Sequence, residues 1–181
     1  SVVSKRRVVV TGLGMLTPLG LDVESTWKAI LASQSGVHAI SNFDTDSSKA
    51  KICASVKNFD PSPYMDVKES RKVADFVQFA VAASHQAMVD SGLDLSASDP
   101  ERIGVAIGSG IGGLPVIEKA YDAWDKGGPR KISPFFIPGA IINMAAGIVS
   151  MKYGLRGPNI SMVTACTTGA HNIGYAFRTI A

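Results

Sequence analysis

Three β-branched runs, each ending in glycines or small residues, constrain the fold of this 181-residue chain more than any other feature. They are RRVVVTGLG at Arg6–Gly14, ERIGVAIGSG at Glu101–Gly110 and PNISMVTA at Pro158–Ala165. Apolar runs of this kind are typical of strands buried within a sheet. A helical pattern follows each run along the chain. Strands that alternate with helices predict an α/β fold with a largely parallel or mixed sheet.

Apolar periodicity and capping residues mark the predicted helices. They run through residues 26–34, 68–91, 114–126 and 134–151, and from 166 onward. Asp22 or Ser25 could cap the first helix, which the pattern closes at Gly36, and Gly92 ends the second. In the last helix, apolar residues recur at the spacing of one helical face: Ala170, Ile173, Phe177 and Ile180. Residues 37–65 are expected to form a loop with short strands.

The composition excludes several classes of function. A net charge of +3 is too small to predict nucleic-acid binding. The two cysteines, Cys53 and Cys166, match no metal-binding spacing and fit a reducing, cytoplasmic environment better than a disulfide framework. The first ten residues lack the apolar stretch of a signal peptide. Residues 132–151 carry no acidic or basic side chain, but prolines and glycines interrupt them, so they predict a core helix and not a membrane span.

Gly108, Gly110 and Gly113 have the G-x-G-x-x-G spacing of a dinucleotide-binding turn, between a predicted strand and a predicted helix. That fingerprint also needs a second strand that ends in an acidic residue about 20 positions later. The candidates, Asp122 and Asp125, fall on the following helix instead. The sequence therefore favours glycines that let the turn approach another backbone or a ligand closely.

Cys166 follows a predicted strand and begins a predicted helix. The unpaired N–H groups at a helix start stabilise a thiolate, and acyl-transfer enzymes place nucleophiles on such strand-to-helix turns. A free cysteine is also among the residue types that are most often simply buried, so local features leave both interpretations open. None of His38, His85 and His171 forms a convincing base, and His171 is expected to pack in the core. Cys53 indicates packing within a strand.

Five blocks of the sequence carry a specific resemblance. They are SKRRVVVTGLGMLTPLG (4–20), ESTWKAILASQSG (24–36), RIGVAIGSGIGGL (102–114), GGPRKISPFFIPG (127–139) and YGLRGPNISMVTACTTG (153–169). With these blocks the chain resembles the N-terminal half of the β-ketoacyl-[acyl-carrier-protein] synthases, with the type II enzymes as the nearest match. The resemblance implies a thiolase-like fold with α/β/α/β/α layers, of which residues 1–181 form one N-terminal domain. It also implies that the natural polypeptide continues past Ala181.

The same resemblance implies the activity of a cytoplasmic condensing enzyme of fatty-acid synthesis. Cys166 would take the acyl group from acyl carrier protein as a thioester, and its backbone N–H would form half of an oxyanion hole. Malonyl carrier protein would then lose CO₂, and its carbanion would attack the thioester and extend the chain by two carbons. No cofactor and no metal are implied. The two histidines, the lysine and the glycine-rich loop that complete the family's site are expected beyond residue 181.

The resemblance also assigns partners. Ile111 is expected to line the acyl pocket, and Phe136 to reach into that pocket across a homodimer interface. Five cations are expected to dock the acidic acyl carrier protein: Lys68, Arg71, Lys72, Arg130 and Lys131. Charge alone would make these residues a solvated surface. No nucleic acid and no membrane insertion are expected.

Three alternatives stay open. A type I condensing enzyme shares the cysteine and differs in its pocket residues. A catalytically incomplete fragment would only bind carrier protein or its own dimer partner. A dinucleotide-binding module has the least support, because half of its fingerprint is missing.

Overall fold

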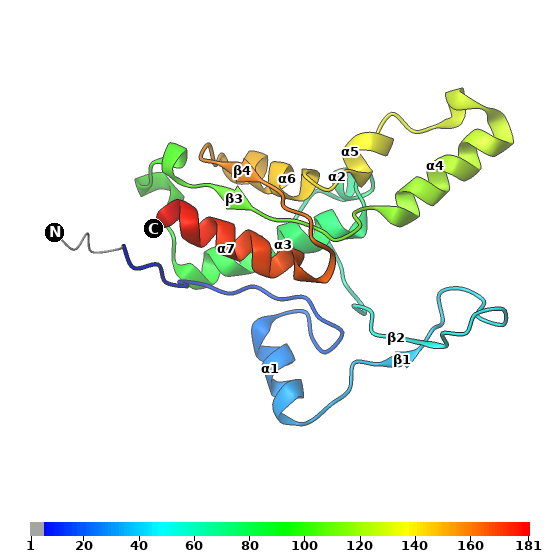
Figure 1. Cartoon of the computed structure of the whole chain (residues 1–181), viewed down its shortest axis with the longest axis horizontal. Coiled ribbons are helices and arrows are strands. Elements are labelled where there is room, and N and C mark those ends of the chain that lie inside the picture. The colour runs from blue at the N-terminus through cyan, green and yellow to red at the C-terminus, as the bar shows by residue number, and fades with distance from the viewer. Residues whose placement is uncertain (1–5) are drawn as a thin grey trace.

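The computed structural model describes residues 6–181 of the chain. Its helices and strands are α1 Val23–Leu31, β1 His38–Ala39, β2 Ile52–Cys53, α2 Val67–Ser70, α3 Asp75–Ser91, β3 Val105–Ala106, α4 Leu114–Gly127, α5 Phe136–Ala140, α6 Met144–Tyr153, β4 Asn159–Ile160 and α7 Thr168–Ile180. In Figure 1, α3, α6, α7 and the β3–β4 pair form the body, while α1 and the β1–β2 hairpin lie apart from it. Helices and strands alternate as predicted for an α/β protein.

Two pairs of strands are formed. β3 pairs with β4 in parallel, with Val105 opposite Asn159, and this confirms two of the predicted strands. β1 pairs with β2 antiparallel, with His38 opposite Cys53, inside the region expected to hold short strands. The parallel pair requires a long crossover, which α4, α5 and α6 supply.

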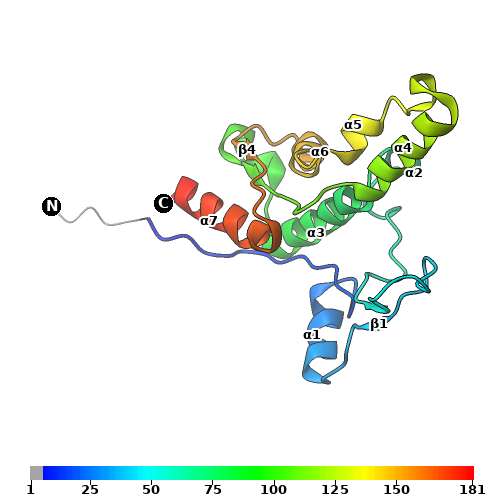
Figure 2. The ribbon, with the colours of Figure 1, turned by 45° about the vertical axis from the view of Figure 1, so that its right-hand side comes forward.

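The predicted buried strand at Arg6–Gly14 is wrong. This segment is extended but pairs with no strand of the described residues, and Val9 and Val10 are 66% and 77% exposed. A β-branched run becomes a buried strand only where neighbouring strands supply hydrogen-bond partners. Near the end of the run a side chain of α3 takes this role, since the Asp90 carboxylate accepts from the Leu13 N–H at 2.9 Å. In Figure 2 the segment runs as an extended stretch beside the body.

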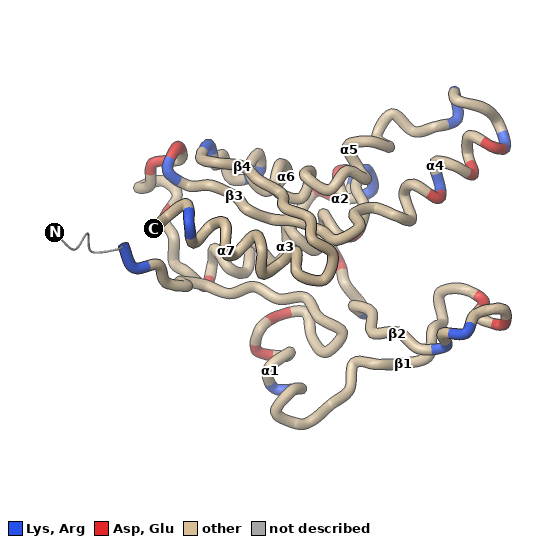
Figure 3. Tube along the Cα trace, viewed as in Figure 1, with Lys and Arg blue, Asp and Glu red and all other residues tan. Residues whose placement is uncertain are grey.

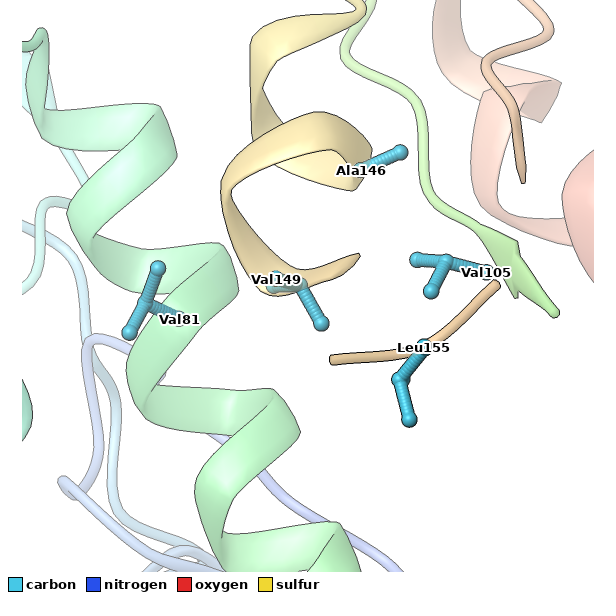
Figure 4. Packing of buried hydrophobic residues seen from close by; sticks show 5 residues of the cluster. All are labelled: Val81, Val105, Ala146, Val149 and Leu155. Atoms are coloured by element: carbon cyan, nitrogen blue, oxygen red, sulfur yellow. The ribbon is translucent and has the colours of Figure 1, made fainter. Parts of the chain in front are cut away.

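The core lies between α3, α6 and β3. Its fully or nearly fully buried members are Val81, Val105, Ala146, Val149 and Leu155. Figure 4 shows the two α6 residues lying between Val81 on one side and Val105 and Leu155 on the other. This confirms that the uncharged stretch at 132–151 contains a core helix. Within residues 6–181, no helix has the length and hydropathy that a membrane crossing requires.

Two predicted helices are each broken into two. The helix expected over 68–91 divides into α2 and α3, because Ala74 is extended and its N–H donates to Gly139 O at 2.9 Å. The helix expected over 134–151 divides into α5 and α6, because Ala140 O accepts from the Gly113 N–H at 3.1 Å. Both breaks therefore arise where tertiary contacts take backbone groups that a continuous helix would use.

The start of α1 depends on Asp22 and not on Ser25. The Asp22 carboxylate accepts from the Ser25 N–H at 2.7 Å, as an N-cap does. The helix ends at Leu31, with Ser33 in the left-handed region, so the predicted close at Gly36 comes too late. Hydrogen bonds from Ser25, by its hydroxyl first and its backbone second, lower the pKa of Asp22 below 3.8.

Asp22→Ala is expected to lower the free energy of unfolding by about 1 kcal/mol at pH 7, because α1 loses its cap. The folded-state pKa of Asp22 is lowered, so this stabilisation is present above the ordinary pKa of 3.8 and is lost as pH falls through the folded-state value. Urea unfolding of both proteins at pH 7 and below pH 3.8 measures the difference. Asp22→Asn is the control, since it retains a capping side chain without a titrating group. A difference that is the same at both pH values would contradict the argument.

Candidate active site

Cys166 lies on a sharp turn between β4 and α7. It belongs to a single 3₁₀ turn, Ala165–Thr167, that leads directly into the 13-residue helix α7. The preceding residue, Ala165, has φ of 52°, a left-handed conformation that costs a residue with a side chain about 1 kcal/mol. Strained backbone of this kind is concentrated at functional sites. Cys166 is exposed, so within residues 6–181 it is not a buried packing residue.

Polar side chains of α7 hold the turn in place. Asn172, only 3% exposed, accepts from the Met162 N–H at 3.1 Å and donates to Met162 O at 3.0 Å. The Thr168 hydroxyl accepts from the Thr164 N–H at 2.9 Å. Both ends of the segment that precedes Cys166 are thus fixed to the helix that follows it. A nucleophile held in this way needs little reorganisation before it attacks.

Sequence reasoning missed Asn172. The sequence places the apolar residues of α7 on one helical face, and on that face Ile173, Phe177 and Ile180 are 71%, 46% and 48% exposed. The buried face instead contains Thr168 and Asn172, one turn apart. A hydroxyl and an amide at i and i+4, just after a candidate nucleophile, are the signal that could have identified this pair.

The glycine turn at 108–113 lies against the cysteine turn. A Cβ atom on Gly108 would lie 2.1 Å from Met162 O and 2.6 Å from Asn172 Nδ2. A Cβ atom on Gly110 would lie 3.3 Å from Ala165 O. These glycines are therefore accounted for by close backbone approach, as the sequence favoured over dinucleotide binding. Ile111, on the same turn, is 69% exposed.

Phe136 lies elsewhere, and it lines a cavity of about 180 Å³ between the segment after α2, α4 and the segment that leads into α5. The apolar lining includes Val73, Val116 and Phe135. Three of the predicted docking cations, Arg71, Lys72 and Lys131, line the same cavity. The structure therefore brings Phe136 together with the cations, while Ile111 lies on the turn beside Ala165.

Lys119 of α4 is a fourth cation that lines this cavity, and it was not among the predicted docking residues. Lys72 is partly engaged, by an ion pair with Glu69 at 2.5 Å and by its position 5.0 Å from the centre of the Phe135 ring. Lys68 on α2 and Arg130 in the turn after α4 do not line the cavity, but each is exposed and lies close in sequence to a cation that does. Figure 3 shows Lys and Arg on α2, on α4 and in the turn after α4, at the end of the molecule that carries α4. Lys119 stands alone between acidic and apolar residues in the sequence, so only the fold groups it with the others.

Of the three histidines, only His171 lies in a setting that differs from the prediction. His171 was expected in the core but is exposed, and its Nδ1 lies 3.3 Å from the Thr164 hydroxyl, one turn from Cys166. His85 pairs with the Tyr153 hydroxyl at 3.1 Å. His38 lies on β1, beside Cys53 of β2. Within residues 6–181, none of the three is hydrogen-bonded to the Cys166 thiol, and no group of three or more His, Cys, Asp or Glu side chains could hold a metal ion.

Comparison with known proteins places these features in a family. A family model described as the N-terminal domain of β-ketoacyl synthase matches residues 5–181. The chain is 60% identical over 177 residues to 3-oxoacyl-[acyl-carrier-protein] synthase 2 of Coxiella burnetii, and 56% identical over 178 residues to the Vibrio cholerae protein of that name. Each alignment covers 98% of this chain and 43% of the relative, so the chain spans less than half the length of these relatives.

Solved structures show the same likeness. A β-ketoacyl synthase from Burkholderia phymatum superimposes with a TM-score of 0.83 at 27% identity, over 97% of this chain and 44% of that one. A type II polyketide ketosynthase, solved in complex with its acyl carrier protein, matches with a TM-score of 0.83 at 26% identity. That match covers 97% of this chain and 47% of the other.

Proposed function

Because the chain belongs to the β-ketoacyl synthase family, we propose that it is the N-terminal part of a condensing enzyme of fatty-acid synthesis. The enzyme elongates acyl carrier protein thioesters by two carbons, with malonyl carrier protein as the donor. The names of the two bacterial relatives support this assignment. The observation that carries it is the exposed Cys166 on a strained turn at the start of α7.

Cys166 acts as the nucleophile of the first half-reaction. Its sulfur attacks the thioester carbonyl of the acyl carrier, a tetrahedral oxyanion forms, and the carrier thiol leaves as the acyl group passes to Cys166. The N-terminal end of α7 favours negative charge, both on the thiolate before attack and on the oxyanion after it. The Cys166 N–H is the donor from this chain that would face the oxyanion. Residues 1–181 thus supply the acyl acceptor and part of its electrostatic support.

In the second half-reaction, malonyl carrier protein loses CO₂ and its carbanion attacks the Cys166 thioester. The carbon–sulfur bond breaks, and the Cys166 thiolate is regenerated as the β-ketoacyl product leaves on the carrier. Ile111, exposed on the glycine turn beside Ala165, is proposed to line the acyl pocket. Phe136 is proposed to reach the pocket of a second subunit in a homodimer. We further propose that the enzyme works in the cytoplasm.

The basic cavity is proposed as the docking site for acyl carrier protein. Four cations line it, namely Arg71, Lys72, Lys119 and Lys131. Lys68 on α2 and Arg130 in the turn after α4 are proposed to add to the same docking site. An acidic partner is drawn to such a cluster over a distance of about 10 Å, and rim cations set its register. The apolar lining of the cavity supplies the uncharged centre that protein interfaces usually contain.

Lys119→Glu is expected to weaken binding of acyl carrier protein by five- to tenfold at low salt, because it puts a negative charge into the cavity wall. Fluorescence anisotropy with labelled carrier protein measures the change. Lys126→Glu is the matched control, since it makes the same charge change near the end of α4, outside the cavity lining. The Lys119 effect should shrink as salt is raised. An equal loss of affinity in the two variants would show that net charge, and not the position of Lys119 in the cavity, determines binding.

The proposed function is tested by incubating the protein with acyl carrier protein thioester and measuring its intact mass. An added acyl group that hydroxylamine removes is expected. Addition of malonyl carrier protein then tests the second half-reaction, whose product is a β-ketoacyl carrier. Carrier binding without any acyl adduct would favour the alternative of a binding fragment. Loss of product beyond short acyl chains would favour the type I enzyme over the type II enzyme.

A further inference from the structure

A second nucleophilic cluster lies on the β1–β2 hairpin. His38 and Cys53 are directly opposed across the antiparallel pair, so their side chains share one face of it. The Cys53 sulfur lies 3.5 Å from Nε2 of His38. The hydroxyl of Ser55 lies 3.1 Å from the same nitrogen and 4.0 Å from the sulfur. The thiol and the hydroxyl, two groups that can give up a proton, thus both lie beside the same imidazole nitrogen.

The orientation of His38 is fixed by its other nitrogen. Nδ1 lies 3.1 Å from the carbonyl oxygen of Gly36. A carbonyl oxygen can only accept, so Nδ1 must carry the proton in this contact. In the neutral ring, Nε2 is then the acceptor, and it faces the thiol of Cys53 and the hydroxyl of Ser55. A nucleophile beside a base that a third group orients is the arrangement that activates cysteines.

The thiol is within reach of a small reagent. Cys53 and His38 are half-buried, and Ser55 is exposed. The hairpin lies away from α7 and from the Cys166 turn in both views of the ribbon (Figures 1 and 2). The sequence indicated only strand packing for Cys53, because nothing in the sequence places residue 38 opposite residue 53. The cluster is independent of the proposed condensing activity.

We propose that Cys53, with His38 as its base, is a thiol–disulfide exchange site for small-molecule disulfides of the glutathione class. The thiol proton passes to Nε2 of His38, and the Cys53 sulfur attacks one sulfur of the disulfide. The disulfide bond breaks, a new sulfur–sulfur bond joins Cys53 to one half, and the other half leaves as a thiolate that takes the proton from His38. The reaction begins with one thiol and one disulfide and ends with one thiol and one disulfide, so it requires no further oxidant.

The test uses the Cys166→Ala protein, in which Cys53 is the only cysteine within residues 1–181, and the modified residue is located by peptide mass after digestion. Oxidised glutathione is added at pH 7, and the mixed disulfide is followed by intact mass. Native Cys53 is expected to react at least about tenfold faster than the same cysteine in the chain unfolded in urea. Burial alone can only slow a thiol, so a faster native rate requires activation by the fold. A native rate equal to or below the unfolded rate would overturn the proposal.

His38→Gln separates the base from the shape of the hairpin. The glutamine amide keeps a polar group near the position of Nε2, but it cannot take up the thiol proton. The rate is expected to fall about tenfold, towards that of the unfolded chain. Ser55→Ala is the control, since it removes the hydroxyl that competes for Nε2, and its rate is expected to stay the same or to rise. An unchanged or faster rate in His38→Gln would contradict the role of His38 as a base. If His38→Gln fails to fold, the comparison of native and unfolded Cys53 still decides the proposal.

Discussion

Cys166→Ala is expected to remove the acyl adduct completely when the protein is incubated with acyl carrier protein thioester. Alanine offers no atom to which the acyl group can be attached, so the thioester of the first half-reaction cannot form. The second half-reaction then has no acyl group to extend. Intact mass before and after hydroxylamine treatment measures the adduct. We expect carrier binding to be unaffected, since the basic cavity is lined by other residues. The effect is therefore on chemistry and not on association.

Cys53→Ala is the matched control for this experiment, because it removes the other thiol from the hairpin and leaves the α7 turn unchanged. Its acyl adduct should form as in the unchanged protein. An adduct that persists in Cys166→Ala and disappears in Cys53→Ala would show that Cys53, and not Cys166, is the nucleophile. That outcome would refute the proposed function at its centre.

Gly108→Ala is expected to lower the free energy of unfolding by about 3 kcal/mol. The new methyl group would overlap Met162 O and approach Asn172 Nδ2, which are partners in the hydrogen bond that ties the cysteine turn to α7. Overpacking and the loss of a buried hydrogen bond cost about 1–3 kcal/mol each. Urea unfolding gives the free energy, and the midpoint should fall without a large change in slope.

Gly174→Ala on α7 provides the comparison, because among the described residues no atom beyond its chain neighbours and the nearby backbone of α7 lies within 4 Å of its Cβ position. Alanine in a helix interior is about 1 kcal/mol more favourable than glycine, so this variant should be slightly more stable. If Gly108→Ala is no less stable than Gly174→Ala, the close approach at residue 108 cannot be what fixes the turn.

Features that act within one helical turn could be predicted from the sequence. Gly92 ends α3 in the left-handed region, as expected. Asp22 was one of two proposed caps, and it is the one that bonds the free N–H. Each of these residues works through its own backbone or through a neighbour three positions away. Such signals need no knowledge of the fold.

Features that depend on distant partners could not be predicted. The division between α2 and α3 requires Gly139, and the exposure of Arg6–Gly14 depends on which strands are present to pair with it. Lys119 joins the basic cavity only because α4 packs beside α5 and the segment that follows α2. The position of Cys166 was predictable, because strand, turn and helix follow one another directly. The residues that support it were not, since they come from other segments.

The parallel pairing of β3 with β4 also bears on the order in which the molecule assembles. Val105 meets Asn159, 54 positions later, and the Ser161 hydroxyl bonds Ile107 O across the same separation. Closing so long a loop costs conformational entropy before any contact compensates for it, so this pairing is slow compared with helix formation. Until β3 and β4 pair, the turn that carries Cys166 lacks its contacts with the glycine turn at 108–113. The proposed nucleophile therefore gains its contacts with the glycine turn only among the last steps of folding.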